Sequence, residues 1–223
     1  MVLNHNTMVL SNNKKESKII NLKKTDFKEE YLNILRILIE NSDKVYSIRK
    51  LSLQRNINYK SAYYVILKLK EYNIIDLEKQ GNTSFVKFNF NFHDSVFLVE
   101  NQRKKDFLKN DDFNVLYNRI SQNIKNPFFI LLVFGSYAKG TQTKNSDLDL
   151  CLITDNENIK KEINLIIETI PYEIHFLDFT TNEFLKMLKT TDFNISKEIV
   201  NNKIILNGIE LFYNLINRYK KNK

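Results

Sequence analysis

Two apolar runs joined by a short polar segment, residues 128–153, constrain the fold of this chain more than any other stretch. The first run, Phe128 to Phe134, is rich in aromatic and branched residues and predicts a strand that is buried on both faces. The chain then turns at Gly135-Ser136 and enters a short helix before the second run, Asp147 to Ile153, which predicts a second strand. We therefore expect two neighbouring strands with a polar turn between them.

The second run carries two acids, Asp147 and Asp149, at a spacing that puts both carboxylates on one face of a strand. Two like charges so close together are costly unless a cation lies between them. A hard divalent ion that also binds substrate phosphates, above all Mg²⁺, suits such a pair. Opposite the acids, the turn offers backbone N–H groups and the Ser136 hydroxyl to an anion. A surface hairpin with solvated aspartates is the alternative, but it leaves acids within apolar strands unexplained.

These residues form a recognisable motif, since Gly135-Ser136 is followed after ten residues by Asp147-Leu148-Asp149-Leu150. The motif resembles the signature of the DNA polymerase β-type nucleotidyltransferase superfamily and is similar to that of its minimal nucleotidyltransferase domains. The resemblance implies that Gly135 and Ser136 hold a nucleoside triphosphate, with ATP as the default. It also implies that Asp147 and Asp149 bind two Mg²⁺ ions, and that an acceptor hydroxyl attacks the α-phosphorus and expels pyrophosphate.

The resemblance further implies a third metal-binding acid on a later strand. The segment Tyr172 to Leu177 follows a helical stretch and predicts such a strand. Alternation puts Glu173 and His175 on one face, so Glu173 is the expected third acid and a candidate general base, in place of the family's usual aspartate. Asp178 is the second choice, and a site without a functional third acid is the remaining alternative. His175 either contacts the nucleotide or is a structural histidine.

Lys139 and Lys144 lie in the segment between the two strands. The resemblance suggests that they assist the triphosphate, and ordinary solvated charges are the alternative. Cys151 is expected to be a small core residue, and a single cysteine excludes an intrachain disulfide. The chain shows no signal peptide and no apolar run of roughly 18 residues, so we expect a cytoplasmic protein without a membrane contact.

The positive charge is concentrated in the N-terminal part of the chain. Residues 1–92 contain 16 Lys and Arg against 9 Asp and Glu, whereas residues 93–223 contain 18 against 17. This asymmetry favours a polyanionic partner for the N-terminal part, and a generic solvated basic surface is the alternative. We expect a flexible N-terminal arm at residues 1–25, a domain at residues 26–92 and a nucleotidyltransferase domain at residues 93–223.

Residues 26–92 show three helical patterns and a hairpin. Ser47 and Asn58 are expected N-caps of the second and third helices, and Gln80-Gly81-Asn82 is the expected hairpin turn. This order resembles a winged helix-turn-helix domain, which implies that the third helix and the hairpin contact DNA. A protein–protein or dimer module is the alternative. The residues that would face DNA are Lys60, Ser61, Tyr64, Lys68, Lys79, Asn82 and Lys87.

The remaining segments predict helices that connect and close the second domain. Arg103-Lys104-Lys105 is expected to be a solvated basic face, and Thr180 with Glu183 forms a capping-box pattern. The fold class expected is α+β, with a winged helix-turn-helix domain followed by a small mixed sheet flanked by helices. The function expected is nucleotidyl transfer coupled to DNA binding, of a toxin–antitoxin type, with a protein acceptor and a homodimer left open. The alternative is a DNA-binding regulator whose second domain senses a nucleotide or binds a partner without turnover.

Overall fold

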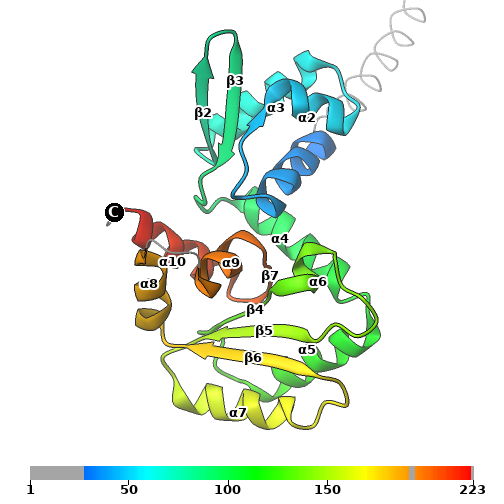
Figure 1. The fold of residues 1–223 in the computed structure, drawn as a ribbon, viewed down its shortest axis with the longest axis vertical. Coiled ribbons are helices and arrows are strands. Elements are labelled where there is room, and N and C mark those ends of the chain that lie inside the picture. Colours follow the sequence, from blue (N-terminus) through cyan, green and yellow to red (C-terminus); the bar gives the residue numbers. More distant parts are fainter. Residues whose placement is uncertain (1–27, 191–193, 222–223) are drawn as a thin grey trace, which may run out of the picture.

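The computed structural model describes residues 28–190 and 194–221, so the expected N-terminal arm at residues 1–25 lies outside the described residues. The fold is a mixture of helices and two small sheets. Figure 1 shows a smaller upper part, formed by the N-terminal elements, above a larger lower part that contains the second sheet. Within the described ranges, none of the helices combines the length and the apolar character needed to cross a membrane.

Among the described residues, the upper part consists of three helices and a three-stranded antiparallel sheet in the order β1-β3-β2. The Ser47 side chain accepts from the backbone N–H of Lys50, and that of Asn58 accepts from Ser61, so both predicted N-caps are present. Gln80 pairs with Thr83, which leaves a two-residue turn. The elements are a helix over residues 28–40, β1 (Tyr46–Ser47), α2 (Ile48–Arg55), α3 (Tyr59–Glu71), β2 (Ile75–Gln80) and β3 (Thr83–Phe88).

The lower part is built around a four-stranded mixed sheet in the order β6-β5-β4-β7. β4 pairs antiparallel with both β5 and β7, whereas β5 and β6 are parallel and are connected through α7. The elements are α4 (Asp94–Phe107), α5 (Asp111–Asn123), β4 (Ile130–Val133), α6 (Gly135–Lys139), β5 (Leu148–Ile153), α7 (Glu157–Ile167), β6 (Ile174–Phe179), α8 (Thr181–Lys189), α9 (Ile195–Asn201), β7 (Ile204–Asn207) and α10 (Ile209–Lys221).

The two faces of this sheet belong to different hydrophobic clusters. Leu148, Leu150 and Leu152 of β5 pack with residues of α5 and α7, which lie below the sheet in Figure 1. Cys151 and Ile153 point to the opposite face, where the cluster continues through α8 and α10 into the upper part. The period-2 pattern of β5 therefore separates the two clusters.

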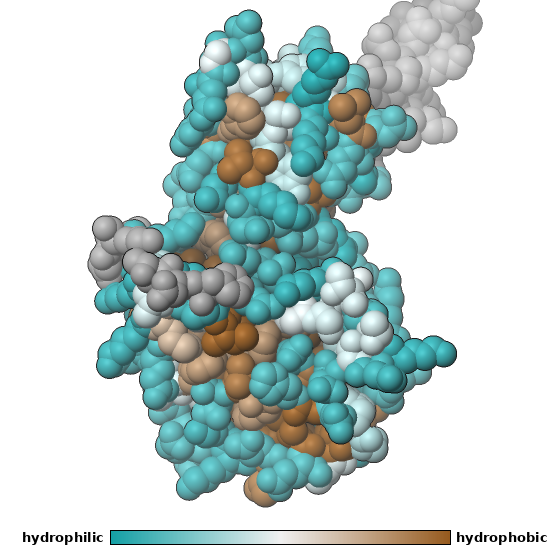
Figure 2. Space-filling view, viewed as in Figure 1, coloured by the Kyte–Doolittle hydropathy of each residue, from teal (hydrophilic) through white to brown (hydrophobic). Residues whose placement is uncertain are grey.

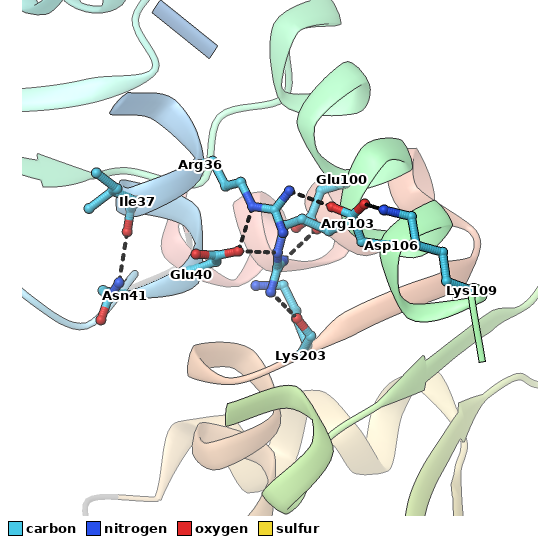
Figure 3. Close-up of polar contacts among 9 residues, drawn as sticks. All are labelled: Arg36, Ile37, Glu40, Asn41, Glu100, Arg103, Asp106, Lys109 and Lys203. Carbon is cyan, nitrogen blue, oxygen red and sulfur yellow. Dashed lines mark hydrogen bonds and ion pairs between the residues drawn. The ribbon is translucent and has the colours of Figure 1, made fainter. Parts of the chain in front are cut away.

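The two parts of the molecule meet around a buried polar network on α4 (Figure 3). The Arg103 guanidinium donates to Glu100 Oε2 at 2.6 Å and to the Lys203 carbonyl at 2.7 Å, and Glu100 accepts from the Tyr213 hydroxyl at 2.7 Å. Arg103 also lies 3.5 Å from Glu40 of the helix over residues 28–40. The prediction that Arg103 belongs to a solvated face is wrong, because it is the counter-charge of a buried glutamate.

Exposed apolar residues lie next to buried ones in the lower part, and one of them, Phe128, was predicted to be buried. Phe128 precedes β4 and is 74% exposed, so the buried run begins one residue later. Val96 is buried, but Phe97 and Leu98 are exposed, since three consecutive residues of a helix cannot all face one core. On α10, Tyr213 is buried.

Candidate active site

The pairing of β4 with β5 brings the Gly135-Ser136 turn beside the acids. Val133 is opposite Leu150, and the backbone N–H of Phe134 donates to the carbonyl of Asp149 at 3.0 Å. The chain leaves β4 at this point and enters the short helix α6, which ends at Gly140 in the left-handed conformation. Two segments that are 14 positions apart in the sequence, Gly135 and Asp149, are therefore direct neighbours.

Gly135 is required at its position for two reasons. Its φ is +67°, a conformation that residues with a Cβ rarely adopt. A Cβ added to Gly135 would also lie 1.9 Å from Oδ2 and 2.7 Å from Cγ of Asp149. The Asp149 carboxylate thus occupies the space that a side chain at residue 135 would need, which explains why a glycine precedes Ser136.

His175 lies on the other side of Asp149. The parallel register of β5 and β6 pairs these two residues, and His175 Nδ1 is 2.9 Å from Asp149 Oδ1. The His175 side chain is 54% exposed and that of Asp149 is 23% exposed, so the pair lies at the surface of the sheet. The two alternatives for His175 both stay predictions. The structure adds that His175 contacts Asp149, a candidate metal-binding acid.

Asp147 and Glu173 line one pocket of about 380 Å³ at the start of β5 and β6. The backbone N–H of Leu148 donates to the carbonyl of Glu173 at 3.1 Å, which holds the two strand ends together. Lys144 lines the same pocket. Within residues 28–190 and 194–221, no group of three or more His, Cys, Asp or Glu side chains is arranged to hold a metal ion. Glu173 as the third metal acid therefore stays a prediction.

Two other candidates are engaged in ion pairs. Lys139 Nζ lies 2.5 Å from a carboxylate oxygen of Glu198 on α9. Asp178 lies 2.5 Å from Lys160 of α7, and this pair raises the pKa of Lys160. A phosphate that is bound by Lys139 would have to replace Glu198, and Asp178 already has a cationic partner.

The donor set fits a hard divalent cation. Mg²⁺ is usually bound through one or two carboxylates together with water and substrate phosphates, without a complete protein cage. Asp147 lines the pocket at the start of β5 and Asp149 lies against Gly135, and these are the two carboxylates that such a cation would use.

The candidate DNA-binding residues lie on α3 and the β2–β3 hairpin. Lys60, Tyr64 and Lys87 are exposed, as are Lys79 and Asn82 of the hairpin. Ser61 and Lys68 are half-buried. Lys68 Nζ donates to Glu71 Oε1 at 2.9 Å, a contact that was not predicted from the sequence.

Two exposed aromatic residues of α3, Tyr59 and Tyr63, lie beside the predicted Tyr64 and were not singled out from the sequence. Tyr59 and Tyr63 stack with their ring centroids 6.3 Å apart, and Tyr63 contacts Tyr64 edge-on. These rings and Leu67 are exposed. Figure 2 shows small hydrophobic patches within a mostly hydrophilic surface over the upper part. The spacing of Tyr59 and Tyr63 by four positions was the signal that could have revealed this face.

Comparison with known proteins agrees with this geometry. Residues 130–206, which contain β4 to β7, match the model of the nucleotidyltransferase domain family. A 5-methylthioadenosine/S-adenosylhomocysteine deaminase of Clostridium tetani (strain Massachusetts / E88) is 28% identical over 101 residues, 44% of this chain. The match covers 24% of that relative, so the chain spans about a quarter of its length.

One solved structure is also similar in part. It is described as "Crystal structure of the toxin-antitoxin with AMP-PNP", and the match covers 50% of this chain and 88% of that chain at 21% identity. The TM-score is 0.33, so this likeness carries no argument about function.

Proposed function

We propose that this chain transfers a nucleotide, AMP from ATP, to a hydroxyl acceptor with the help of Mg²⁺. The contact between Gly135 and the Asp149 carboxylate carries the proposal, because it joins the glycine-serine turn to one of the two candidate metal-binding acids. The match of residues 130–206 to the nucleotidyltransferase domain family supports the reaction class.

The residues have separate roles in this proposal. Asp147 and Asp149 would hold Mg²⁺, which supplies charge neutralisation at the substrate phosphates. The N–H groups and hydroxyl of the Gly135-Ser136 turn would bind the triphosphate, with Lys144 nearby and Lys139 after release from Glu198. The acceptor oxygen bonds to the α-phosphorus, the bond to pyrophosphate breaks, and Glu173 would accept the hydroxyl proton.

The upper part would bring the site to its partner. We propose that residues 28–92 form a winged helix-turn-helix domain that binds DNA, since three helices precede an antiparallel hairpin and α3 presents Lys60 and Tyr64 to solvent. The acceptor would then be a protein partner of the toxin–antitoxin type. This assignment of the acceptor rests on the sequence resemblance.

A transfer assay tests the reaction. The full chain is given α-labelled ATP, GTP, CTP or UTP with Mg²⁺ and a host lysate, and label is followed on protein and RNA. We expect label from ATP on one acceptor with the wild type and a loss of at least about 100-fold in Asp147→Asn and Asp149→Asn, because each substitution removes a charge from the cation site.

The matched control is Asp155→Asn, an acid at the far end of β5 that bonds the backbone of α8 instead. It should transfer like the wild type. Nucleotide binding without transfer in the wild type, with binding kept in both aspartate variants, would contradict the proposal and support a nucleotide-sensing regulator.

A further inference from the structure

We propose that His175 is a positioning residue that fixes the Asp149 carboxylate and thereby determines how tightly the site holds a divalent cation. The role of this cation site in nucleotidyl transfer rests on the proposed function. The structural part rests on contacts of the described residues alone: the hydrogen bond of Asp149 to His175 and the close approach of Asp149 to Gly135.

The Asp149 carboxylate is held from two sides. Oδ1 is 2.9 Å from His175 Nδ1, and Oδ2 lies against the α-carbon of Gly135, where a methyl group would not fit. Oδ2 thus occupies the space beside the Gly135 backbone, and a rotation that moves Oδ1 away would break the hydrogen bond. Asp149 is 23% exposed, so some of its surface stays open to solvent and to a ligand.

The chemistry of residue 175, which is paired with Asp149 on the neighbouring strand, determines whether it repels or orients the Asp149 carboxylate. A third carboxylate at residue 175 would repel Asp149 in the absence of a cation. An imidazole that carries hydrogen on Nδ1 donates to Asp149 and orients it before a cation arrives. The His175 ring also lies beside Phe134, with the ring centroids 6.3 Å apart.

Loss of this hydrogen bond should weaken cation binding without loss of the fold. Removal of a residue that orients a metal ligand typically costs about 10–100-fold in metal affinity or activity. His175 is more than half exposed, so its replacement leaves no core cavity. We therefore expect the thermal unfolding midpoint of a His175 variant to stay close to that of the wild type.

The experiment compares three substitutions at residue 175 in the full chain, with Mn²⁺ as the probe and free Mn²⁺ followed by electron paramagnetic resonance. His175→Asn keeps an N–H donor near the Nδ1 position, whereas His175→Gln moves the amide outward and His175→Ala removes the donor. We expect Mn²⁺ affinity close to that of the wild type for Asn and a loss of about 10-fold or more for Gln and Ala.

A second background shows that the effect passes through Asp149. In Asp149→Asn, the further change His175→Ala should leave Mn²⁺ affinity unchanged, because the carboxylate to be positioned is absent. Unchanged affinity in His175→Ala alone, equal losses in Asn and Gln, or a wild type that binds no Mn²⁺ would each overturn the inference. A wild type that shows the expected Mn²⁺ pattern but transfers no label would instead overturn the proposed function.

Discussion

Gly135 carries two constraints at once, because its backbone has a positive φ and its α-carbon faces the Asp149 carboxylate. The first constraint is local and follows from the turn after β4. The second depends on the register between β4 and β5. Gly140 has a similar φ of +69°, but no atom lies within 4 Å of an added Cβ. A substitution of Gly140 therefore introduces backbone strain alone, whereas a substitution of Gly135 introduces backbone strain together with a steric conflict.

Gly135→Ala should displace the Asp149 carboxylate and weaken cation binding. Both variants, Gly135→Ala and Gly140→Ala, should pay about 1–2 kcal/mol of backbone strain in unfolding free energy. Gly135→Ala should in addition lose at least about 10-fold in Mn²⁺ affinity, since Asp149 has to move. Urea unfolding and Mn²⁺ titration measure the two effects, and equal Mn²⁺ affinity of the two variants would contradict the steric account.

The sequence predicts the residues of this site better than their contacts. The acid pair and the glycine-serine turn follow from period-2 alternation and from motif spacing. The contact of His175 with Asp149 depends on a parallel register between two strands that are separated by α7, which local pattern does not encode. Cys151 was predicted as a core residue and is buried, and its burial raises the pKa of its thiol.

At the scale of elements, α3 presents a mixed aromatic and basic face. Its inward stripe of Ala62, Val65, Ile66 and Leu69 is buried, and helical spacing and the Asn58 cap are local signals from which such a stripe can be predicted. The partners of its outward side chains are less predictable. Lys68 is held by Glu71, which leaves Lys60 as the less restricted cation.

Lys60→Gln should weaken DNA binding to the same degree for all sequences and reduce the slope of log affinity against log salt by about one unit. Lys161→Gln on α7 is the matched control, since it removes the same exposed charge from the other part of the molecule. It should leave the slope unchanged. Gel shifts over a salt series measure both variants. Equal slopes for the two, or no binding of the wild type at low salt, would remove the DNA proposal.

At the scale of the whole molecule, one hydrophobic cluster extends from the upper part into the lower part. Phe88 and Phe90 lie against Tyr213 of α10, with ring centroids 6.1 and 6.5 Å apart. The expected domain boundary between residues 92 and 93 stays a prediction. These contacts join residues more than 120 positions apart, so composition and charge along the chain could not reveal them.

Lys203 at this junction should make stability depend on pH. It is buried among Phe90, Phe212 and Tyr213, and burial lowers its pKa to about 8. Above that pH the folded chain has released a proton that the unfolded chain keeps up to about 10.5, so the unfolding free energy rises with pH in this window. Below it, the cost of the buried charge is fully present.

Lys203→Met should remove this dependence. The wild type should gain on the order of 2 kcal/mol of unfolding free energy between about pH 7.5 and about pH 9.5, relative to Lys203→Met. Urea unfolding at several pH values measures the difference, which cancels the contributions of other groups such as Lys220. Parallel pH profiles of the two proteins would show that Lys203 does not titrate in this window.

The junction also determines what the site can reach. Residues 89–93 connect β3 to α4, and they are held by buried Phe90 and by the bond from Lys220 to the Asn89 carbonyl. The distance between α3 and Gly135 is therefore fixed by side chains that are packed at the junction. Under the proposed function, a macromolecule that binds α3 would be modified only at hydroxyls that lie at this distance from α3. The choice of acceptor would then depend on distance as well as on chemistry.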